Sequence, residues 1–339
     1  MINNLKTVLL SASFLLAAAA LKAQTIVNLQ QGKPSSIRGM SVIDDSVAWI
    51  SGSKGYVAIT HDGGKTWQWQ QVKGFEKADF RAIEAFSATD AIIMSSGTPA
   101  MVLKTTDGGA NWQVKYTNAD TTYFFDAMGF ADKNHGYILG DPIKGKFLIM
   151  ETKNGGETWL PFKNQPNALP GEAAFAASGT CFRVEKNKLT IVSGGFASRE
   201  LTLVTKGGAD DWLQNKLPFP NQKSSEGAFS VAIKGTTKVF MGGDYANDKR
   251  TDSVVCYTLN DKTKLAFPKQ GPNGYQSCVE YVTGAVFLAT GTPGSNITID
   301  NGNTWTKIDN TSFNVCRKAK HGKLVLLAGN GGKTAILKL

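Results

Sequence analysis

The chain has 339 residues and a formal net charge of +10, with 19% charged and 42% hydrophobic residues. This length allows two ordinary domains, and such a charge surplus attracts acidic partners. Because the lysines and arginines form no contiguous block, we expect no nucleic-acid partner. The four cysteines show neither CxxC spacing nor a nearby histidine pair, which argues against a zinc site.

The first 23 residues have the pattern of a secretory signal peptide. Lys6 precedes an apolar stretch over residues 7–21, and the small residue Ala23 ends the segment. The stretch is shorter than the about 20 apolar residues that a membrane-spanning helix needs. We therefore expect cleavage after Ala23, export to the periplasm or the exterior, and no stable membrane insertion. Removing Lys6 and Lys22 takes the formal charge from +10 to +8.

Short apolar strands that end near glycine recur seven times along the rest of the chain. The spacing of these repeats is typical of four-stranded blades rather than of a helical solenoid. We therefore predict an all-β fold, with one seven-bladed β-propeller over residues 24–339. The last repeat lacks an outer strand, which residues 25–30 can supply to close the ring. The seven copies are 48–52, 92–97, 136–140, 190–194, 238–242, 285–291 and 324–329.

An octapeptide that begins with Thr and ends with Trp recurs in the outer hairpins. It spans Thr60–Trp67, Thr105–Trp112, Thr152–Trp159 and Thr298–Trp305, and weaker copies span 205–212 and 258–265. Its glycines allow a tight turn, and its Asp or Asn can accept backbone hydrogen bonds. We expect it to be structural, without a metal, with the indole between adjacent blades. The residues given this role are Asp62, Trp67, Asp107, Trp112, Asn154, Trp159, Trp212, Asp300 and Trp305.

The starts of the innermost strands supply one equivalent position per blade beside the central channel. Guanidinium groups there can bind carboxylates through paired hydrogen bonds, and aromatic faces accept apolar groups. This ring predicts a site for a protein segment or an acidic ligand. Alternatively, its phenylalanines fill the channel and its arginines pair with acids such as Glu84. The ring is Arg38, Arg81, Phe125, Phe175, Phe229, Gln276 and Asn314, with Asp141 and Asp244 beside it.

Acidic residues near the same strand starts allow a second function. Glu172 and Glu226 occupy equivalent positions on two adjacent blades, and Asp126 lies near them in the repeat pattern. Paired carboxylates can hydrolyse glycosidic bonds, so these three are the candidate catalytic residues of a glycoside hydrolase. The alternative is that they are solvated acids at strand starts. The insert 245–252 is expected to overhang this face as a loop.

The four cysteines are Cys181, Cys256, Cys278 and Cys316. Cys278 and Cys316 fall at matching positions of two successive repeats, and therefore on neighbouring strands. In an exported protein this placement permits a disulfide. We favour buried free thiols and leave the disulfide open.

The octapeptide resembles the Asp box, or BNR repeat, of sialidase-type propellers. Together with Ile37-Arg-Gly-Met-Ser41, Ala48-Trp-Ile-Ser-Gly52 and the Arg81 repeat, it makes the chain similar to the photosystem II stability and assembly factor family. That resemblance implies a non-catalytic scaffold that binds proteins during the assembly of membrane complexes. It places Arg38 and Arg81 in a basic patch near the channel. We expect a monomer.

Enzymatic relatives match less well. Sialidases resemble the chain in their Asp boxes but carry an Arg-Ile-Pro motif, whereas here Arg38 is followed by Gly39 and Met40. Some relatives are labelled oxidoreductases. The chain has no GxGxxG motif between a strand and a helix and no evident haem or flavin motif, so we expect no cofactor.

Overall fold

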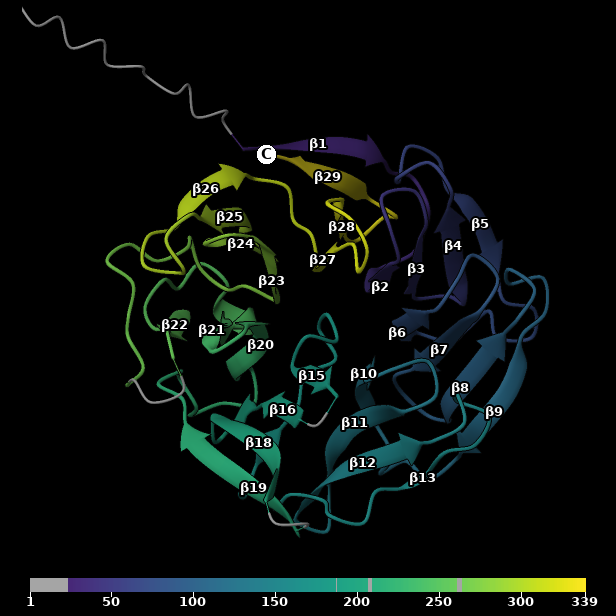
Figure 1. Cartoon of the computed structure of the whole chain (residues 1–339), viewed down its shortest axis with the longest axis horizontal. Helices are drawn as coiled ribbons and strands as arrows, with labels where there is room; N and C mark the ends of the chain where they lie inside the picture. Colours follow the sequence, from purple (N-terminus) through teal and green to yellow (C-terminus); the bar gives the residue numbers. More distant parts are fainter. Residues whose placement is uncertain (1–23, 187, 207–208, 261–263) are drawn as a thin grey trace, which may run out of the picture.

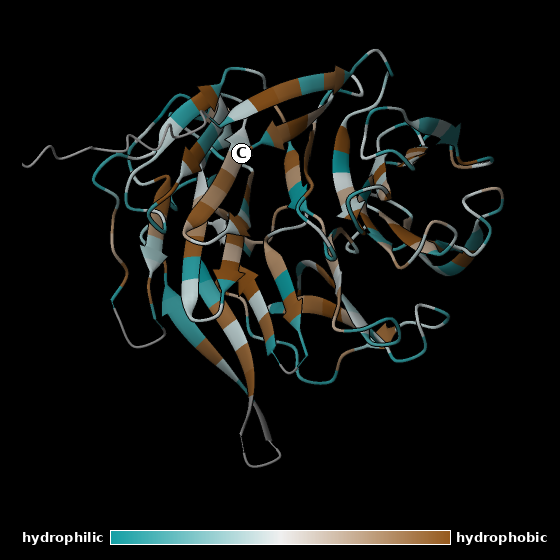
Figure 2. Cartoon of the chain, turned by 45° about the horizontal axis from the view of Figure 1, so that its top comes forward, coloured by the Kyte–Doolittle hydropathy of each residue, from teal (hydrophilic) through white to brown (hydrophobic). Residues whose placement is uncertain are grey.

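The computed structural model describes residues 24–186, 188–206, 209–260 and 264–339. The predicted signal peptide lies outside these residues. Seven antiparallel sheets are arranged around a central axis in the described chain (Figure 1). The predicted all-β, seven-bladed propeller is therefore confirmed. Figure 2 shows hydrophobic residues along the strands of the blades and many hydrophilic residues in the loops that connect them.

The first three blades each contain four strands in chain order. Blade one contains β2 (Ile37–Val42), β3 (Ala48–Gly52), β4 (Tyr56–Thr60) and β5 (Gln68–Gln71). Blade two contains β6 (Phe80–Ala85), β7 (Ala91–Ser95), β8 (Ala100–Thr105) and β9 (Gln113–Asn118). Blade three contains β10 (Phe125–Phe130), β11 (Gly136–Ile143), β12 (Lys146–Thr152) and β13 (Leu160–Pro161).

The next blades are less regular. Blade four contains β15 (Phe182–Glu185), β16 (Lys188–Val192), β18 (Arg199–Lys206) and β19 (Ala209–Lys216). Blade five contains β20 (Glu226–Lys234), β21 (Thr237–Asp244) and β22 (Val255–Thr258), and its sheet is extended inward by β17 (Gly194–Gly195) and β14 (Glu172–Ala173). Blade six contains β23 (Cys278–Thr283), β24 (Val286–Gly291), β25 (Gly294–Thr298) and β26 (Thr306–Asp309).

The two ends of the described chain close the ring in blade seven. This blade contains β27 (Val315–Lys318), β28 (Val325–Ala328), β29 (Thr334–Lys338) and, as its outermost strand, β1 (Thr25–Gln30). β1 pairs antiparallel with β29, with Thr25 opposite Lys338 (Figure 1). The predicted closure is confirmed. It pairs a sheet edge that would otherwise be open.

The four full octapeptides share one hydrogen-bonded turn. In the first, the Thr60 hydroxyl accepts from Gly64 N (2.9 Å) and donates to Asp62 Oδ1 (2.8 Å), while Asp62 accepts from Thr66 N (2.9 Å). Gly63 and Gly64 have φ of 71° and 89°, a region that a side chain would strain. The turn thus satisfies its own polar groups, and the equivalent bonds recur around Asp107, Asn154 and Asp300.

The tryptophan of each full octapeptide packs toward the preceding blade. Trp305 is 1% exposed and belongs to a cluster that includes Val239 and Tyr257 of blade five. Trp159 clusters with Ile92 of blade two. The octapeptides therefore stabilise the contacts between blades.

Acid should weaken the first octapeptide turn. Hydrogen bonds from the backbone and side chain of Thr66 lower the pKa of Asp62 from 3.8 to about 2. Because the pKa is lowered on folding, the stabilisation is present above pH 3.8 and is lost as the pH falls through about 2. We expect the urea midpoint of unfolding to fall less steeply with acid in Asp62→Asn than in the wild-type chain. Asn154→Asp, which adds a carboxylate at the equivalent position of blade three, should steepen the dependence; equal slopes in all three proteins would contradict this account.

Three features predicted from the sequence differ in the structure. Residues 174–177, with Phe175, were aligned with the strand starts of other blades, but residues 174–181 leave the sheet and the innermost strand of blade four begins at Phe182. The weak copy at 205–212 overlaps the long hairpin of β18 and β19, where Trp212 lies opposite Leu203. In the insert 245–252, Tyr245–Asn247 form a short 3-10 helix, η1. The departure of residues 174–181 from the sheet displaces the innermost strand of blade four along the sequence. The glycines of the repeat keep their positions, so the sequence pattern gives no sign of this displacement.

Candidate functional site

The two faces of the ring can be told apart by strand direction. β2 and β4 are each antiparallel to β3, so they run in the same direction. The octapeptide that follows β4 therefore lies on the face where β2 ends, and Gly63 N donates to Ser46 O in the β2–β3 turn at 2.9 Å. We call this the octapeptide face. The opposite one, where the innermost strands begin, is the strand-start face.

Residues 174–181 enter the central channel, and we call them the channel plug. In Figure 1 the loop that precedes β15 reaches toward the axis of the ring. Arg38 Nη1 of blade one donates to Ala177 O (3.3 Å), and Ser178 Oγ donates to Ser277 O of blade six (2.7 Å). Thr180 and Ser230 of blade five share a hydroxyl hydrogen bond of 2.6 Å. The small side chains of this segment allow it to contact blades from several sides of the channel.

The two predicted arginines lie together on the strand-start face. Arg81 Nε donates to Asp79 Oδ2 at 2.7 Å, and the two side chains are 29% and 27% exposed. Burial, followed by the charge of Arg81, lowers the pKa of Arg38. The Asp79 carboxylate neutralises only part of the charge of the two guanidinium groups. The remaining local excess of positive charge favours the binding of an anion. Asp79, two residues before Arg81, was not singled out from the sequence, and Glu84 pairs with Lys320 instead.

Two of the three ring phenylalanines pack against each other. Phe175 of the channel plug stacks on Phe229 with ring centroids 3.7 Å apart and an interplanar angle of 7°. Tyr275 meets Phe229 edge-on at 4.9 Å. Phe125 is fully buried beside Tyr116. The aromatic side chains thus hold the plug and the blade cores, and only Phe175 is half-exposed among the three ring phenylalanines.

The two amides of the ring are also buried. Gln276 Nε2 donates to Gly274 O at 3.2 Å within its own turn. Asn314 Nδ2 donates to Ile37 O (3.0 Å) and to Asn330 Oδ1 (2.9 Å), which joins blade seven to blade one. These bonds fix neighbouring backbone, and burial keeps both amides from a ligand, although Gln276 Oε1 has no hydrogen-bond partner among the described residues.

The candidate catalytic glutamates have partners within the protein. Glu172 forms a buried ion pair with Arg199, whose Nε donates to Oε1 at 2.9 Å and whose Nη2 donates to Oε2. Glu226 accepts from Gln222 N at 2.7 Å and pairs with Arg250 at 3.3 Å. Asp244 accepts from Ala246 N at 2.9 Å and caps η1. All three carboxylates therefore bond to groups of the protein itself and stabilise the local structure around them.

Two acids lie beneath the start of the channel plug. Ala174 N donates to Asp141 Oδ1 at 3.2 Å, and burial raises the pKa of Asp141 to about 6. Asp126 is 1% exposed, and burial together with Asp141 raises its pKa well above 3.8. The shift favours the protonated form of Asp126, which therefore offsets little of the positive charge of Arg81. Asp141, with a pKa of about 6, is largely ionised at neutral pH.

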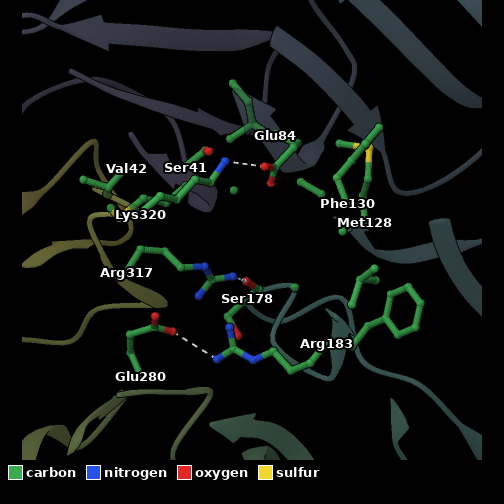
Figure 3. Close-up of a pocket in the computed structure, with 18 of the residues that line it drawn as sticks. Ser41, Val42, Glu84, Met128, Phe130, Ser178, Arg183, Glu280, Arg317 and Lys320 are labelled. Atoms are coloured by element: carbon green, nitrogen blue, oxygen red, sulfur yellow. Dashed lines mark hydrogen bonds and ion pairs between the residues drawn. The ribbon is translucent and has the colours of Figure 1, made fainter. Parts of the chain in front are cut away.

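Two hollows lie on the strand-start face, and their linings include neither Arg38 nor Arg81. One of about 660 Å³ is lined by residues 74–79 and 95–99 with Met101. Another of about 550 Å³ is lined by residues 141–142, Gly145 and 168–173. A third hollow, of about 230 Å³, occupies the channel on the octapeptide side of the plug (Figure 3).

Neither a metal cluster nor a membrane-spanning helix is found in the described part of the chain. Among residues 24–339, outside the gaps given above, no three His, Cys, Asp or Glu side chains are grouped to hold a metal ion. Within the same residues, no helix is long and apolar enough to cross a bilayer.

Comparisons with known proteins place the fold. Residues 18–119 match the family model described as Photosynthesis system II assembly factor YCF48. No curated protein matches the chain. A structure described as YCF48 bound to D1 peptide is 15% identical, with a TM-score of 0.64 over 93% of this chain and 95% of that one.

Two further structures have the same overall shape. YCF48 from Cyanidioschyzon merolae is 16% identical, with a TM-score of 0.60 over 92% of this chain and 98% of its own. U3-55K is 12% identical, with a TM-score of 0.63 over 93% and 98%. At these identities the structures establish a shared fold. With the sequence match over residues 18–119, they identify the chain as a β-propeller that resembles the photosystem II assembly factors.

Proposed function

We propose that this chain is an exported, non-catalytic scaffold that binds an extended, acidic protein segment across its strand-start face, in the assembly of envelope proteins. The observation that carries the proposal is the pair Arg38 and Arg81, which lie near one half-buried carboxylate, Asp79, that pairs with Arg81. A carboxylate ligand would accept hydrogen bonds from both guanidinium groups.

The shape of the surface supports an extended ligand. Hollows of about 660 Å³ and 550 Å³ lie among the loops of the strand-start face. We place the bound segment across both hollows, with its acidic side chains at Arg38 and Arg81. Backbone groups and small side chains line much of both hollows, so a peptide of varied sequence can be accepted while the charge selects acidic ones.

Two comparisons support a protein ligand. The family model that matches residues 18–119 describes an assembly factor, and a structure with the same fold is bound to a peptide. The glutamates considered for hydrolysis are held in ion pairs, which favours a scaffold over a glycoside hydrolase.

Charge reversal of both arginines should abolish acidic-peptide binding. The probes are fluorescently labelled extended peptides in two matched versions, one with Asp and Glu and one with Asn and Gln at the same positions. Their affinity for the chain is measured by fluorescence polarisation. We expect the acidic peptides to bind the wild-type chain and to lose about tenfold or more in affinity in Arg38→Glu/Arg81→Glu, with a smaller loss in Arg81→Gln.

The matched control reverses the same amount of charge on the other face. Lys65 and Lys153 are exposed residues of octapeptide turns, so Lys65→Glu/Lys153→Glu changes the net charge equally. Binding should survive in this control. Equal loss in both double variants would reject the site, and undiminished binding in the arginine variant would reject it as well.

A further inference from the structure

Two cysteines of neighbouring blades form a buried pair beside the channel. Cys278 begins β23 of blade six, and Cys316 lies on β27 of blade seven. Both side chains are fully buried free thiols, and their Sγ atoms are 3.6 Å apart. A disulfide bond needs about 2.05 Å, so the two sulfur atoms must move closer together to be joined.

The sulfur of Cys278 lies near four hydrogen-bond donors and one acceptor, Cys316 O at 3.4 Å. Arg317 Nη1 and Cys316 N each lie 3.4 Å from it, and Cys316 Sγ donates to it at 3.6 Å. The Thr180 hydroxyl of the channel plug donates at 3.8 Å. A neutral thiol accepts such bonds weakly, whereas a thiolate accepts all of them strongly. The surroundings of Cys278 therefore stabilise its negatively charged form.

The electrostatics of the pair are asymmetric. Burial disfavours the Cys278 thiolate, but the hydrogen bonds from Cys316 and the charge of Arg317 outweigh it and lower the pKa of Cys278. Burial and the neighbouring sulfur raise the pKa of Cys316. One sulfur is therefore the better nucleophile, and the other holds its proton until the first has reacted.

The other two cysteines lack this environment. Cys181 and Cys256 are as fully buried as the pair, and burial raises the pKa of each. Neither has an arginine among the causes of its shift. They provide internal controls of equal burial without a neighbouring arginine.

A hollow leads to the arginine that contacts Cys278. The cavity of about 230 Å³ in Figure 3 is lined by Arg317, and by Ser178 and Gly179 of the channel plug. Arg317 Nη2 donates to Ser178 O at 2.6 Å, so the same guanidinium faces the cavity, the plug and the sulfur. Because both thiols are fully buried, a small oxidant can reach them more easily than the disulfide of another protein can.

We propose that Cys278 and Cys316 form a dithiol site for a hydroperoxide, with Cys278 as the attacking thiolate and Cys316 as the resolving thiol. The Cys278 sulfur attacks one peroxide oxygen, the O–O bond breaks, and the departing hydroxide takes up a proton to become water. Cys316 then loses its proton and attacks the sulfenic sulfur, which releases a second water. Two thiols and one hydrogen peroxide thus give one disulfide and two waters, and the peroxide accepts both electrons.

The test oxidises the folded chain with hydrogen peroxide, blocks the remaining thiols after denaturation, and maps the peptides by mass spectrometry. We expect a peptide pair joined through Cys278 and Cys316, formed at least about tenfold faster than oxidation of Cys181 or Cys256. In urea, where the donors are dispersed, this preference should disappear. Equal rates for all four cysteines in the folded chain, or no joined pair, would overturn the proposal.

Variants separate the roles of the residues. In Cys316→Ser the reaction should stop at a Cys278 sulfenic acid that dimedone captures, whereas in Cys278→Ser the Cys316 thiol should not be captured. Arg317→Met should slow the reaction of Cys278 about tenfold, and Arg317→Lys should retain most of it. Circular dichroism of each variant checks the fold. Capture at Cys316 in place of Cys278, in folded protein, would contradict the assigned order.

Discussion

Replacing Trp305 with alanine should lower the free energy of unfolding by about 3–5 kcal/mol. The side chain is 1% exposed, and its Nε1 donates to Gly302 O at 3.0 Å. Its ring is packed with Val239 and Tyr257 of the preceding blade and with Phe287 of its own. Removing the ring leaves a cavity between two blades that cannot close without moving both sheets.

The measurement is urea unfolding followed by circular dichroism, because fluorescence changes with every tryptophan removed. The matched control is Trp112→Ala, which removes the same octapeptide residue from a half-buried position, where the ring meets Trp49 edge-on at 6.3 Å. We expect a clearly smaller loss in this control. Equal losses would show that the motif, rather than the depth of burial, determines the effect.

Replacing Arg199 with methionine should destabilise the chain by about 3–5 kcal/mol, because it leaves the Glu172 carboxylate buried without its counter-charge. The Glu172 side chain is 0% exposed and that of Arg199 is 9% exposed. Glu172 Oε2 also accepts from Leu169 N at 2.8 Å, and Arg199 Nη2 donates to Asn167 O at 2.9 Å. The ion pair thus holds the segment that leads into the channel plug.

A double variant tests whether the loss comes from the unpaired charge. Glu172→Gln/Arg199→Met keeps an acceptor for Leu169 N and removes both charges, so more than half of the lost stability should return. The same Glu172→Gln change also tests the glycoside hydrolase alternative. If the wild-type chain hydrolyses aryl glycosides and the Glu172→Gln variant does not, the chain is a glycoside hydrolase and the scaffold proposal is wrong.

The proposed site on the strand-start face could be inferred only in part from the sequence. Arg38 and Arg81 were found because each begins a repeat, and the structure places them together. Their partner Asp79 lies in the loop before β6, outside the repeated positions. Arg199, which pairs with Glu172, lies 27 residues away along the chain and has no equivalent in the other blades. A single sequence offers no signal for a pairing of that kind.

The sequence by itself determined the blade number, the closure by residues 25–30 and the octapeptide turns, because these depend on local patterns. Strand periodicity, glycines of positive φ and a Thr–Asp–Thr spacing act within a few residues of one another. Only the tertiary structure decided that residues 174–181 enter the channel, that Phe175 stacks on Phe229, and that Cys278 meets Arg317. Those contacts join residues of different blades, and their geometry depends on how the whole ring closes.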